Sequence, residues 1–159
     1  MGINFSKWVH IKSQKILLER AGHHCPGVYA IAYSSQNLHN NDFDFIQDII
    51  YFGMSVSKKY LRGRLYQFFR GIYSNCKEHG AAYRMKHELN NEDNEWIDKM
   101  YISLKPFPHC GSRTLSPNDL LYMGDVAKEE YVCLSKYLEL FNKLPRFNEK
   151  AFFRKKKES

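Results

Sequence analysis

The stretch of sequence that decides the fold is the apolar segment Gly27-Val28-Tyr29-Ala30-Ile31-Ala32-Tyr33. It follows the turn signal Cys25-Pro26, and its β-branched and aromatic residues predict a strand. A second apolar segment, residues 45–52, comes after the polar residues 34–44 and predicts a strand antiparallel to the first. Residues 96–104 predict a third strand. We therefore expect a small, three-stranded, mainly antiparallel sheet.

Helical patterns surround these strands. Residues 7–21 place apolar side chains at helical spacing and stop at Gly22, and residues 58–73 carry an apolar stripe on one side. Residues 79–89 predict a short helix, and residues 125–143 form the longest helical pattern. The expected fold class is small α+β, with helices flanking the sheet.

The length of the chain predicts a single domain. Its 159 residues are enough to bury a sizeable core without a disulfide or a structural metal. We divide residues 1–159 into an N-terminal helix (7–21), a core that carries the motifs described below (27–148) and a basic tail (149–159).

The composition predicts a soluble, cytoplasmic protein. Hydrophobic residues make up 43% and charged residues 26%, which excludes a mostly disordered chain. No apolar run approaches the roughly 20 residues that cross a bilayer, so no membrane association is expected. The start of the chain lacks a secretory core, and the four widely spaced cysteines are expected to be reduced thiols.

The charge balance indicates an anionic partner. There are 24 Lys and Arg against 17 Asp and Glu, which gives a formal net charge of +7. The sequence closes on the basic run Arg154-Lys155-Lys156-Lys157. The simplest partner for such a chain is nucleic acid.

Four short motifs follow one another in order. Gly27-Val28-Tyr29 opens the first strand, Tyr51-Phe52-Gly53-Met54-Ser55 closes the second, and Leu61-Arg62-Gly63-Arg64-Leu65 opens a helix. Much later, Glu129-Glu130-Tyr131-Val132-Cys133-Leu134 lies on a helix that is followed by Pro145-Arg146-Phe147-Asn148. From residue 27 to 148 this order resembles the GIY-YIG nuclease family, which includes homing endonucleases, the N-terminal nuclease of the excision-repair incision subunit and some restriction enzymes.

The resemblance implies a role for each motif residue. Tyr29 corresponds to the family's first motif tyrosine and candidate general base, and Tyr51 to its second. Arg64 corresponds to the phosphate-binding arginine, and Glu130 to the single ligand of a Mg²⁺ or Mn²⁺ ion. Asn148 corresponds to the asparagine that closes the site. No small-molecule cofactor is implied.

The chemistry of these residue types agrees with those roles. Hydrolysis of a phosphodiester needs an activated water, a cation against the developing negative charge and a proton for the leaving oxygen. Arg64 can bind a phosphate through two parallel N–H donors, and Glu130 offers the hard oxygen ligand that Mg²⁺ prefers. Tyr29 can act as a base only where nearby cations favour its phenolate, because an unperturbed tyrosine has a pKa near ~10.

One departure from the family pattern concerns the residue four positions after the arginine. The family has Tyr or His there, whereas this chain has Phe68. Tyr66 takes that place if Arg62 is the matching arginine. His79 and His87 are alternatives from elsewhere in the chain.

Two further departures involve the second motif and the acidic helix. Some members carry a Lys just after the glycine of the second motif, where this chain has Met54. The distance from Glu130 to Asn148 exceeds the usual one, so Glu129 and Glu139 remain alternative metal ligands.

Other basic residues are expected to contact nucleic acid. They lie before the first motif, along the helix after the second motif and in the basic tail: His24, Lys58, Lys59, Arg62, Arg70, Arg154 and Lys155. Such contacts add salt-sensitive affinity without sequence choice.

These observations predict a metal-dependent endonuclease that cleaves DNA phosphodiester bonds by direct attack of water, as a stand-alone restriction-type or mobile-element enzyme. A restriction-type member is expected to act as a homodimer, since a single-metal site cuts one strand at a time. The alternative is a non-catalytic module that binds nucleic acid or a partner, and Phe68 and Met54 favour it. RNA stays open as a substrate.

Overall fold

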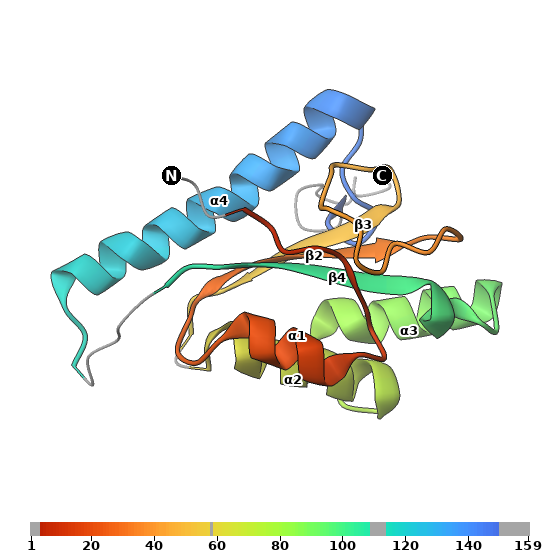
Figure 1. Ribbon diagram of the computed structural model, residues 1–159, viewed down its shortest axis with the longest axis horizontal. Coiled ribbons are helices and arrows are strands. Elements are labelled where there is room, and N and C mark those ends of the chain that lie inside the picture. Colours follow the sequence, from red (N-terminus) through yellow and green to blue (C-terminus); the bar gives the residue numbers. More distant parts are fainter. Residues whose placement is uncertain (1–3, 58, 109–113, 150–159) are drawn as a thin grey trace, which may run out of the picture.

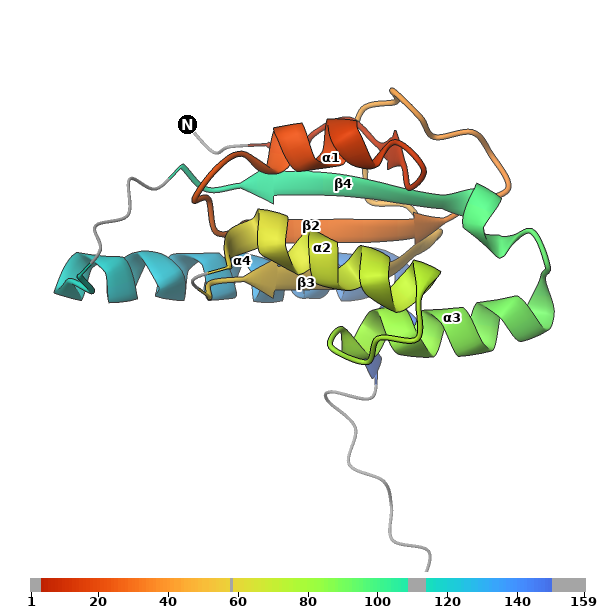
Figure 2. The same ribbon diagram turned by 90° about the horizontal axis from the view of Figure 1, so that it is seen from below.

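The computed structural model describes residues 4–57, 59–108 and 114–149. Its α-helices are α1 (Gln14–Ala21), α2 (Tyr60–Tyr73), α3 (Gly80–Glu92) and α4 (Pro117–Phe141), and residues 96–99, predicted as the start of a strand, form the short 3-10 helix η1 (Trp96–Lys99). The α-helices lie in two layers on either side of one antiparallel sheet, so the predicted α+β class is confirmed (Figure 1). Helix α4 covers one face of the sheet, and α1, α2 and α3 lie on the other (Figure 2).

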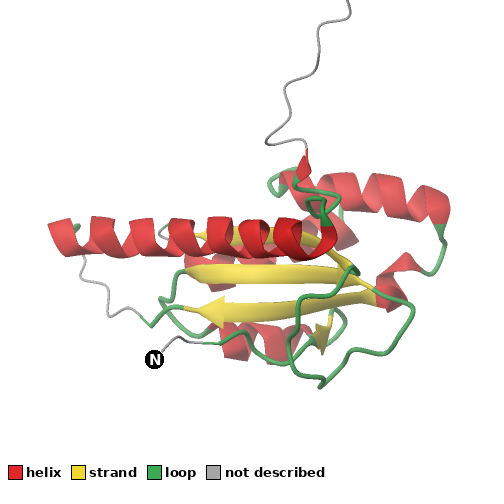
Figure 3. Ribbon diagram, turned by 90° about the horizontal axis from the view of Figure 1, so that it is seen from above, coloured by secondary structure: helices red, strands yellow, loops and turns green. Residues whose placement is uncertain are grey.

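Four strands form the sheet: β1 (Val9–His10), β2 (Gly27–Tyr33), β3 (Ile49–Ser55) and β4 (Met100–Pro106). Their spatial order is β1-β4-β2-β3, and each neighbouring pair is antiparallel. β2 is therefore an inner strand, whereas β3 lies at an edge of the sheet. Helix α4 runs along the β3 side of the sheet (Figure 3).

The prediction of three strands is wrong, because residues 7–13 do not belong to the N-terminal helix. That helix was expected over 7–21, but α1 begins at Gln14. The preceding residues Val9 and His10 pair with β4 and form the fourth strand. Trp8 packs on the α4 side of the sheet and Val9 on the opposite side, which is the two-residue period of a strand.

Both faces of β2 are buried, which explains its continuous apolar sequence. Val28, Ala30 and Ala32 pack in the core beneath α4. Tyr29 and Ile31 point to the other face, into the core shared with α1, α2 and α3. Helices on both faces of the sheet thus replace the alternation of polar and apolar residues that a half-exposed strand would show.

Helix α4 begins at Pro117, well before the predicted residue 125. Ser116 and Asp119 form a reciprocal capping box that satisfies backbone N–H groups at its start. The first half of α4 extends past the ends of the strands (Figure 3). Within the described ranges, no helix has the length and apolar content that crossing a membrane requires.

Candidate active site

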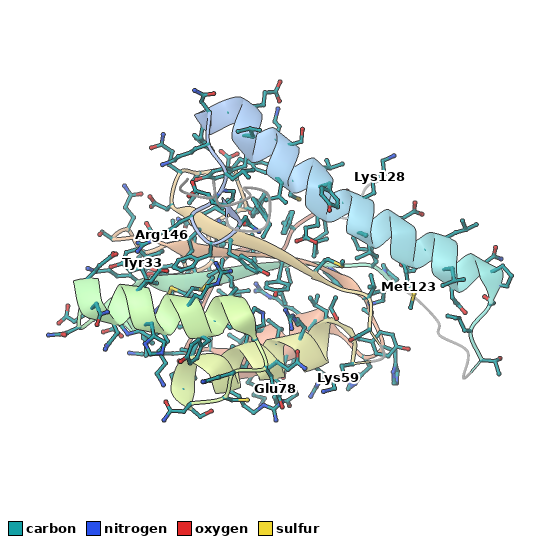
Figure 4. The ribbon with its side chains drawn as sticks, turned by 180° about the vertical axis from the view of Figure 1, so that it is seen from behind. Tyr33, Lys59, Glu78, Met123, Lys128 and Arg146 are labelled. Atoms are coloured by element: carbon teal, nitrogen blue, oxygen red, sulfur yellow. The ribbon has the colours of Figure 1, made fainter. Side chains whose placement is uncertain are left out.

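The structure brings residues from four elements to the edge of the sheet formed by β3. Tyr29 comes from β2, Tyr51 from β3, Arg64 from α2 and Glu130 from α4. Seen from behind, β3 runs between α4 above and helices α2 and α3 below (Figure 4). The four residues are separated in sequence, so the folding of the sheet between its two helical layers is what unites them.

A glycine lets the two tyrosines lie side by side. Tyr29 is directly opposite Gly53 in the β2–β3 register, and the ring centroids of Tyr29 and Tyr51 are 6.0 Å apart. A Cβ atom at position 53 would lie 2.5 Å from the Tyr29 hydroxyl oxygen and 2.7 Å from the Tyr51 ring. The second motif therefore needs glycine here because the phenol ring of Tyr29 fills the space.

The two tyrosines differ in their access to solvent. Tyr29 is only 1% exposed, whereas Tyr51 is half-buried. Burial raises the pKa of Tyr29 well above its ordinary value, and the proximity of Tyr51 adds to this effect. Burial also raises the pKa of Tyr51, as does the nearby carboxylate of Glu130. The positive charge of Arg64 opposes both shifts, so Arg64 is the cation that would favour a phenolate at this pair.

A third side chain, that of His79, contacts the tyrosine pair from the N-cap position of α3. Its Nε2 atom is 2.7 Å from the Tyr29 hydroxyl oxygen, and its Nδ1 atom accepts a hydrogen bond from the Ala82 N–H at the N-terminus of α3. The side chain is fully buried. Burial, followed by the charge of Arg64, lowers the pKa of His79 from 6.5 to about 3, so the imidazole is neutral at physiological pH.

The position of His79 distinguishes it from the other candidates considered in place of Phe68. Phe68 is a core residue with no exposed surface, and its ring centroid is 5.2 Å from that of His79. Tyr66 is exposed and lines an open surface pocket together with Gln14 of α1. His87 is also exposed and packs on Tyr83. Of the three alternatives, the structure brings only His79 to the first motif tyrosine.

Glu130 is a half-buried carboxylate that faces Arg64 across this edge. Burial raises its pKa to about 7, while the charge of Arg64 acts in the opposite direction. Among the described residues, Glu130 has no hydrogen-bond or ion-pair partner. A carboxyl group in this situation is poised between its neutral and charged forms near neutral pH.

The other acidic alternatives are engaged elsewhere. Glu129 forms a largely buried ion pair with Lys105, in which the Oε1–Nζ distance is 2.5 Å. Glu139 is exposed and pairs with Lys136 at 3.5 Å. Glu130 is therefore the acid of α4 that shares its surroundings with Arg64 and Tyr51.

Glu130 is the side chain at this edge that could hold a magnesium ion. The described parts of the chain contain no group of three His, Cys, Asp or Glu side chains that could hold a metal ion. Mg²⁺ does not need such a group, because it keeps several waters and binds through one or two carboxylates together with substrate phosphate. A dication would also stabilise the charged form of a carboxylate whose pKa is raised by burial.

Asn148 joins the C-terminal segment to the edge of β3. Its Oδ1 accepts from the Phe52 N–H and its Nδ2 donates to the Phe52 carbonyl oxygen, each at 2.9 Å. The neighbouring Phe147 N–H donates to the Ile50 carbonyl oxygen at 2.9 Å. Both ends of the Asn148 amide are thereby bound to the backbone of β3, and the residue lies against the outer edge of this strand.

Replacing Asn148 with alanine should lower the free energy of unfolding by about 2–4 kcal/mol, because two buried backbone groups of Phe52 lose their partners. Asn148→Asp should also be destabilised, since a carboxylate cannot donate to the Phe52 carbonyl oxygen. Urea unfolding followed by circular dichroism measures both changes. The exposed Asn90 of α3 supplies the control, and Asn90→Ala should stay within ±0.5 kcal/mol. Equal stability of Asn148→Ala and wild type would contradict this role.

Arg84 is a residue of the site that the sequence did not indicate. Its Nη2 donates to the Phe147 carbonyl oxygen at 3.0 Å, and its charge lowers the pKa values of Tyr51 and His79. It thus supplies a second positive charge beside the tyrosine pair. No pattern in the sequence singles out this arginine, because its position depends on how α3 packs against α2.

The predicted nucleic-acid contacts fall into three groups. Lys59 occupies the N-cap position of α2, Arg62 lies in the first turn of this helix, and the exposed His24 packs edge-on against Tyr60 with 5.4 Å between the ring centroids. Arg70 is near the other end of α2 and forms an ion pair with Glu78. Lys58, Arg154 and Lys155 lie outside the described residues.

Comparisons of the chain with protein-family models, curated proteins and solved structures found no significant match.

Proposed function

We propose that this protein is a metal-dependent endonuclease that hydrolyses DNA phosphodiester bonds, as a restriction-type member of the GIY-YIG family. The observation that carries the proposal is the meeting of Tyr51, Arg64 and Glu130 at one sheet edge, with Tyr29 and His79 directly behind. A phosphate-binding cation, a pair of phenols and a carboxylate can supply the charge stabilisation, the proton transfer and the metal ligand that such hydrolysis uses.

The arrangement of the motifs also supports the resemblance. Tyr29 and Tyr51 lie on neighbouring antiparallel strands, and the helix that carries Arg64 follows directly. The acidic helix α4 packs on the opposite face of the same strands, and Asn148 returns to β3. A cytoplasmic location and a homodimeric state belong to the same proposal.

In this proposal each side chain of the site has a task. Arg64 binds the scissile phosphate and stabilises the charge that develops on it during attack. Because Tyr29 is buried, a proton that leaves the attacking water reaches the pair through Tyr51. Glu130 would hold Mg²⁺ or Mn²⁺, which supplies Lewis-acid stabilisation of the phosphate and leaving oxygens when bound.

A plasmid-cleavage assay tests the proposal. Wild-type protein should nick or linearise supercoiled DNA in Mg²⁺ or Mn²⁺ and not in EDTA. Arg64→Ala should reduce the rate by about 10²–10³-fold, because it removes the cation that faces the transition-state charge. Arg20→Ala is the matched control, since Arg20 lies on α1 and bonds the Lys7 carbonyl oxygen. It should cleave at the wild-type rate.

The substrate panel should contain genomic DNA from several sources and RNA, because a rare or modified recognition site would hide activity on one plasmid. Cleavage that persists in EDTA, or that Arg64→Ala leaves intact, would contradict the proposal.

A second candidate function is a non-catalytic nucleic-acid-binding module on the same fold. Two observations favour it: Tyr29 is buried away from any substrate, and Phe68 belongs to the core. This function would produce a gel shift that weakens with salt, is indifferent to Mg²⁺ and is accompanied by no cleavage product.

A further inference from the structure

We propose that His79 is a positioning residue that directs the hydroxyl proton of Tyr29 toward Tyr51. This inference rests on the proposed nuclease function. It concerns a hydrogen-bonded chain that runs from the backbone of α3 through His79 to the Tyr29 hydroxyl, beside the more exposed phenol of Tyr51.

The N-terminus of α3 selects the tautomer of His79. The Ala82 backbone N–H can only donate, and it lies 3.2 Å from Nδ1, so Nδ1 must be the unprotonated nitrogen. A neutral imidazole then carries its proton on Nε2. The Nε2–H therefore donates to the Tyr29 oxygen at 2.7 Å, and it cannot accept the Tyr29 proton in return.

The Tyr29 proton consequently has to go to another acceptor. Tyr51 lies next to the Tyr29 hydroxyl, because the place of a Cβ atom at Gly53 is 2.5 Å from the Tyr29 oxygen and 2.7 Å from the Tyr51 ring, and the two ring centroids are 6.0 Å apart. Each donor in such a chain strengthens the next. His79 thus increases the ability of Tyr29 to stabilise a phenolate on Tyr51, where the proton of the attacking water would arrive.

The surroundings hold His79 in this orientation. The imidazole is fully buried, and its ring lies 5.2 Å from that of Phe68, 6.1 Å from that of Tyr29 and 6.2 Å from that of Tyr51. A hydroxyl or imidazole on residue 68 is unnecessary in this arrangement, because His79 reaches the first motif tyrosine from the next helix.

Two substitutions separate the positioning role from the capping role. His79→Asn keeps an acceptor for the Ala82 N–H but is too short to reach Tyr29, so kcat should fall about 10- to 100-fold at unchanged KM. His79→Gln can return an N–H donor to the position of Nε2 while it loses the cap. It should cleave faster than His79→Asn and yet unfold at a lower urea concentration.

The inference is supported if His79→Gln is more active but less stable than His79→Asn. A merely structural role predicts instead that the less stable variant is also the less active one. Identical kcat in His79→Asn and wild type would overturn the inference. Steady-state cleavage kinetics and urea unfolding give the two rankings.

Nitrogen-15 NMR of the imidazole supplies a readout that does not depend on cleavage. We expect the Nε2–H tautomer between pH 6 and 8, and we expect Tyr29→Phe to shift the Nε2 signal. The Nδ1–H tautomer would overturn the inference even in an active enzyme. If the wild type cleaves nothing, the proposed function and the catalytic role of His79 both fail, whereas the NMR result still establishes whether the hydrogen-bonded chain exists.

Discussion

Replacing Glu130 with glutamine should reduce DNA cleavage by about 10²–10³-fold or more and, at the same time, make the metal-free protein more stable above pH 7. The loss of activity follows from the loss of the carboxylate that would hold the metal ion. The gain in stability follows from burial, which raises the pKa of Glu130 from 4.5 to about 7. Glutamine has nearly the same shape and carries no charge to bury.

The upward shift of the Glu130 pKa determines how the stability of the protein changes with pH. Between about pH 4.5 and 7 the unfolded chain has released the Glu130 proton, while the folded protein still holds it, so this group destabilises the fold progressively as pH rises. Above pH 7 Glu130 is ionised in both the folded and the unfolded protein, and the full cost of burying its charge lowers the free energy of unfolding. Because the side chain is partly exposed, we expect about 1–2 kcal/mol at pH 8 rather than what the whole shift implies, and almost no difference at pH 4.

Urea unfolding of wild type and Glu130→Gln in EDTA at pH 4 and pH 8 measures this difference. Glu139→Gln is the matched control, because Glu139 lies on the same helix with an exposed side chain. It should change neither cleavage nor the pH dependence of stability. In addition, Mg²⁺ should stabilise the wild type at pH 8 and leave Glu130→Gln unaffected. A stability difference that is equal at both pH values, or retained cleavage, would contradict the assignment of Glu130.

Replacing Gly53 with alanine should displace the Tyr29 hydroxyl and lower the cleavage rate by about 10²-fold or more. The added methyl group would lie 2.5 Å from the Tyr29 oxygen, a separation that demands movement. Tyr29 has little room to move, since it is buried and bonded to His79. Such crowding of a packed core costs about 1–3 kcal/mol of stability.

Substitution of another glycine, Gly124, is expected to have the opposite effect on stability. A Cβ atom at Gly124, on α4, would meet no other atom within 4 Å. Gly124→Ala should therefore raise the free energy of unfolding by about 0.5–1 kcal/mol, because alanine is the better helix former, and cleavage should be unchanged. Cleavage assays and urea unfolding of the two variants give the comparison. An active, fully stable Gly53→Ala variant would show that the tyrosine pair tolerates displacement.

The strands show which parts of the fold could be predicted from the sequence. The turn at Cys25-Pro26 and the apolar run after it are local features, and β2 occurs where they indicate. Residues 7–13 were assigned to a helix because Trp8 and Ile11 also fit a helical stripe. Val9 instead pairs with Ile102, far along the chain, and no local pattern reports such a partner.

In the candidate site, too, some features could be predicted from the sequence and others depend on long-range packing. Tyr29, Tyr51, Arg64 and Glu130 were selected as a set by the order of their motifs, and the structure brings them to one edge of the sheet. The contribution of Arg84 was not predicted, because the charge of a helical arginine acts on a site only when the helix packs against it.

By itself, the sequence determined the α+β class, the antiparallel pairing around β2 and the residue types from which the site is built. All of these follow from short-range turn signals, apolar runs and motif order. Tertiary structure alone decided that the sheet has a fourth strand, that Glu130 rather than Glu129 faces Arg64, and that His79 contacts the Tyr29 hydroxyl. The physical reason is that a neighbouring glutamate on a helix points about 100° away, so the packing of α4 on the sheet selects which carboxylate reaches the site.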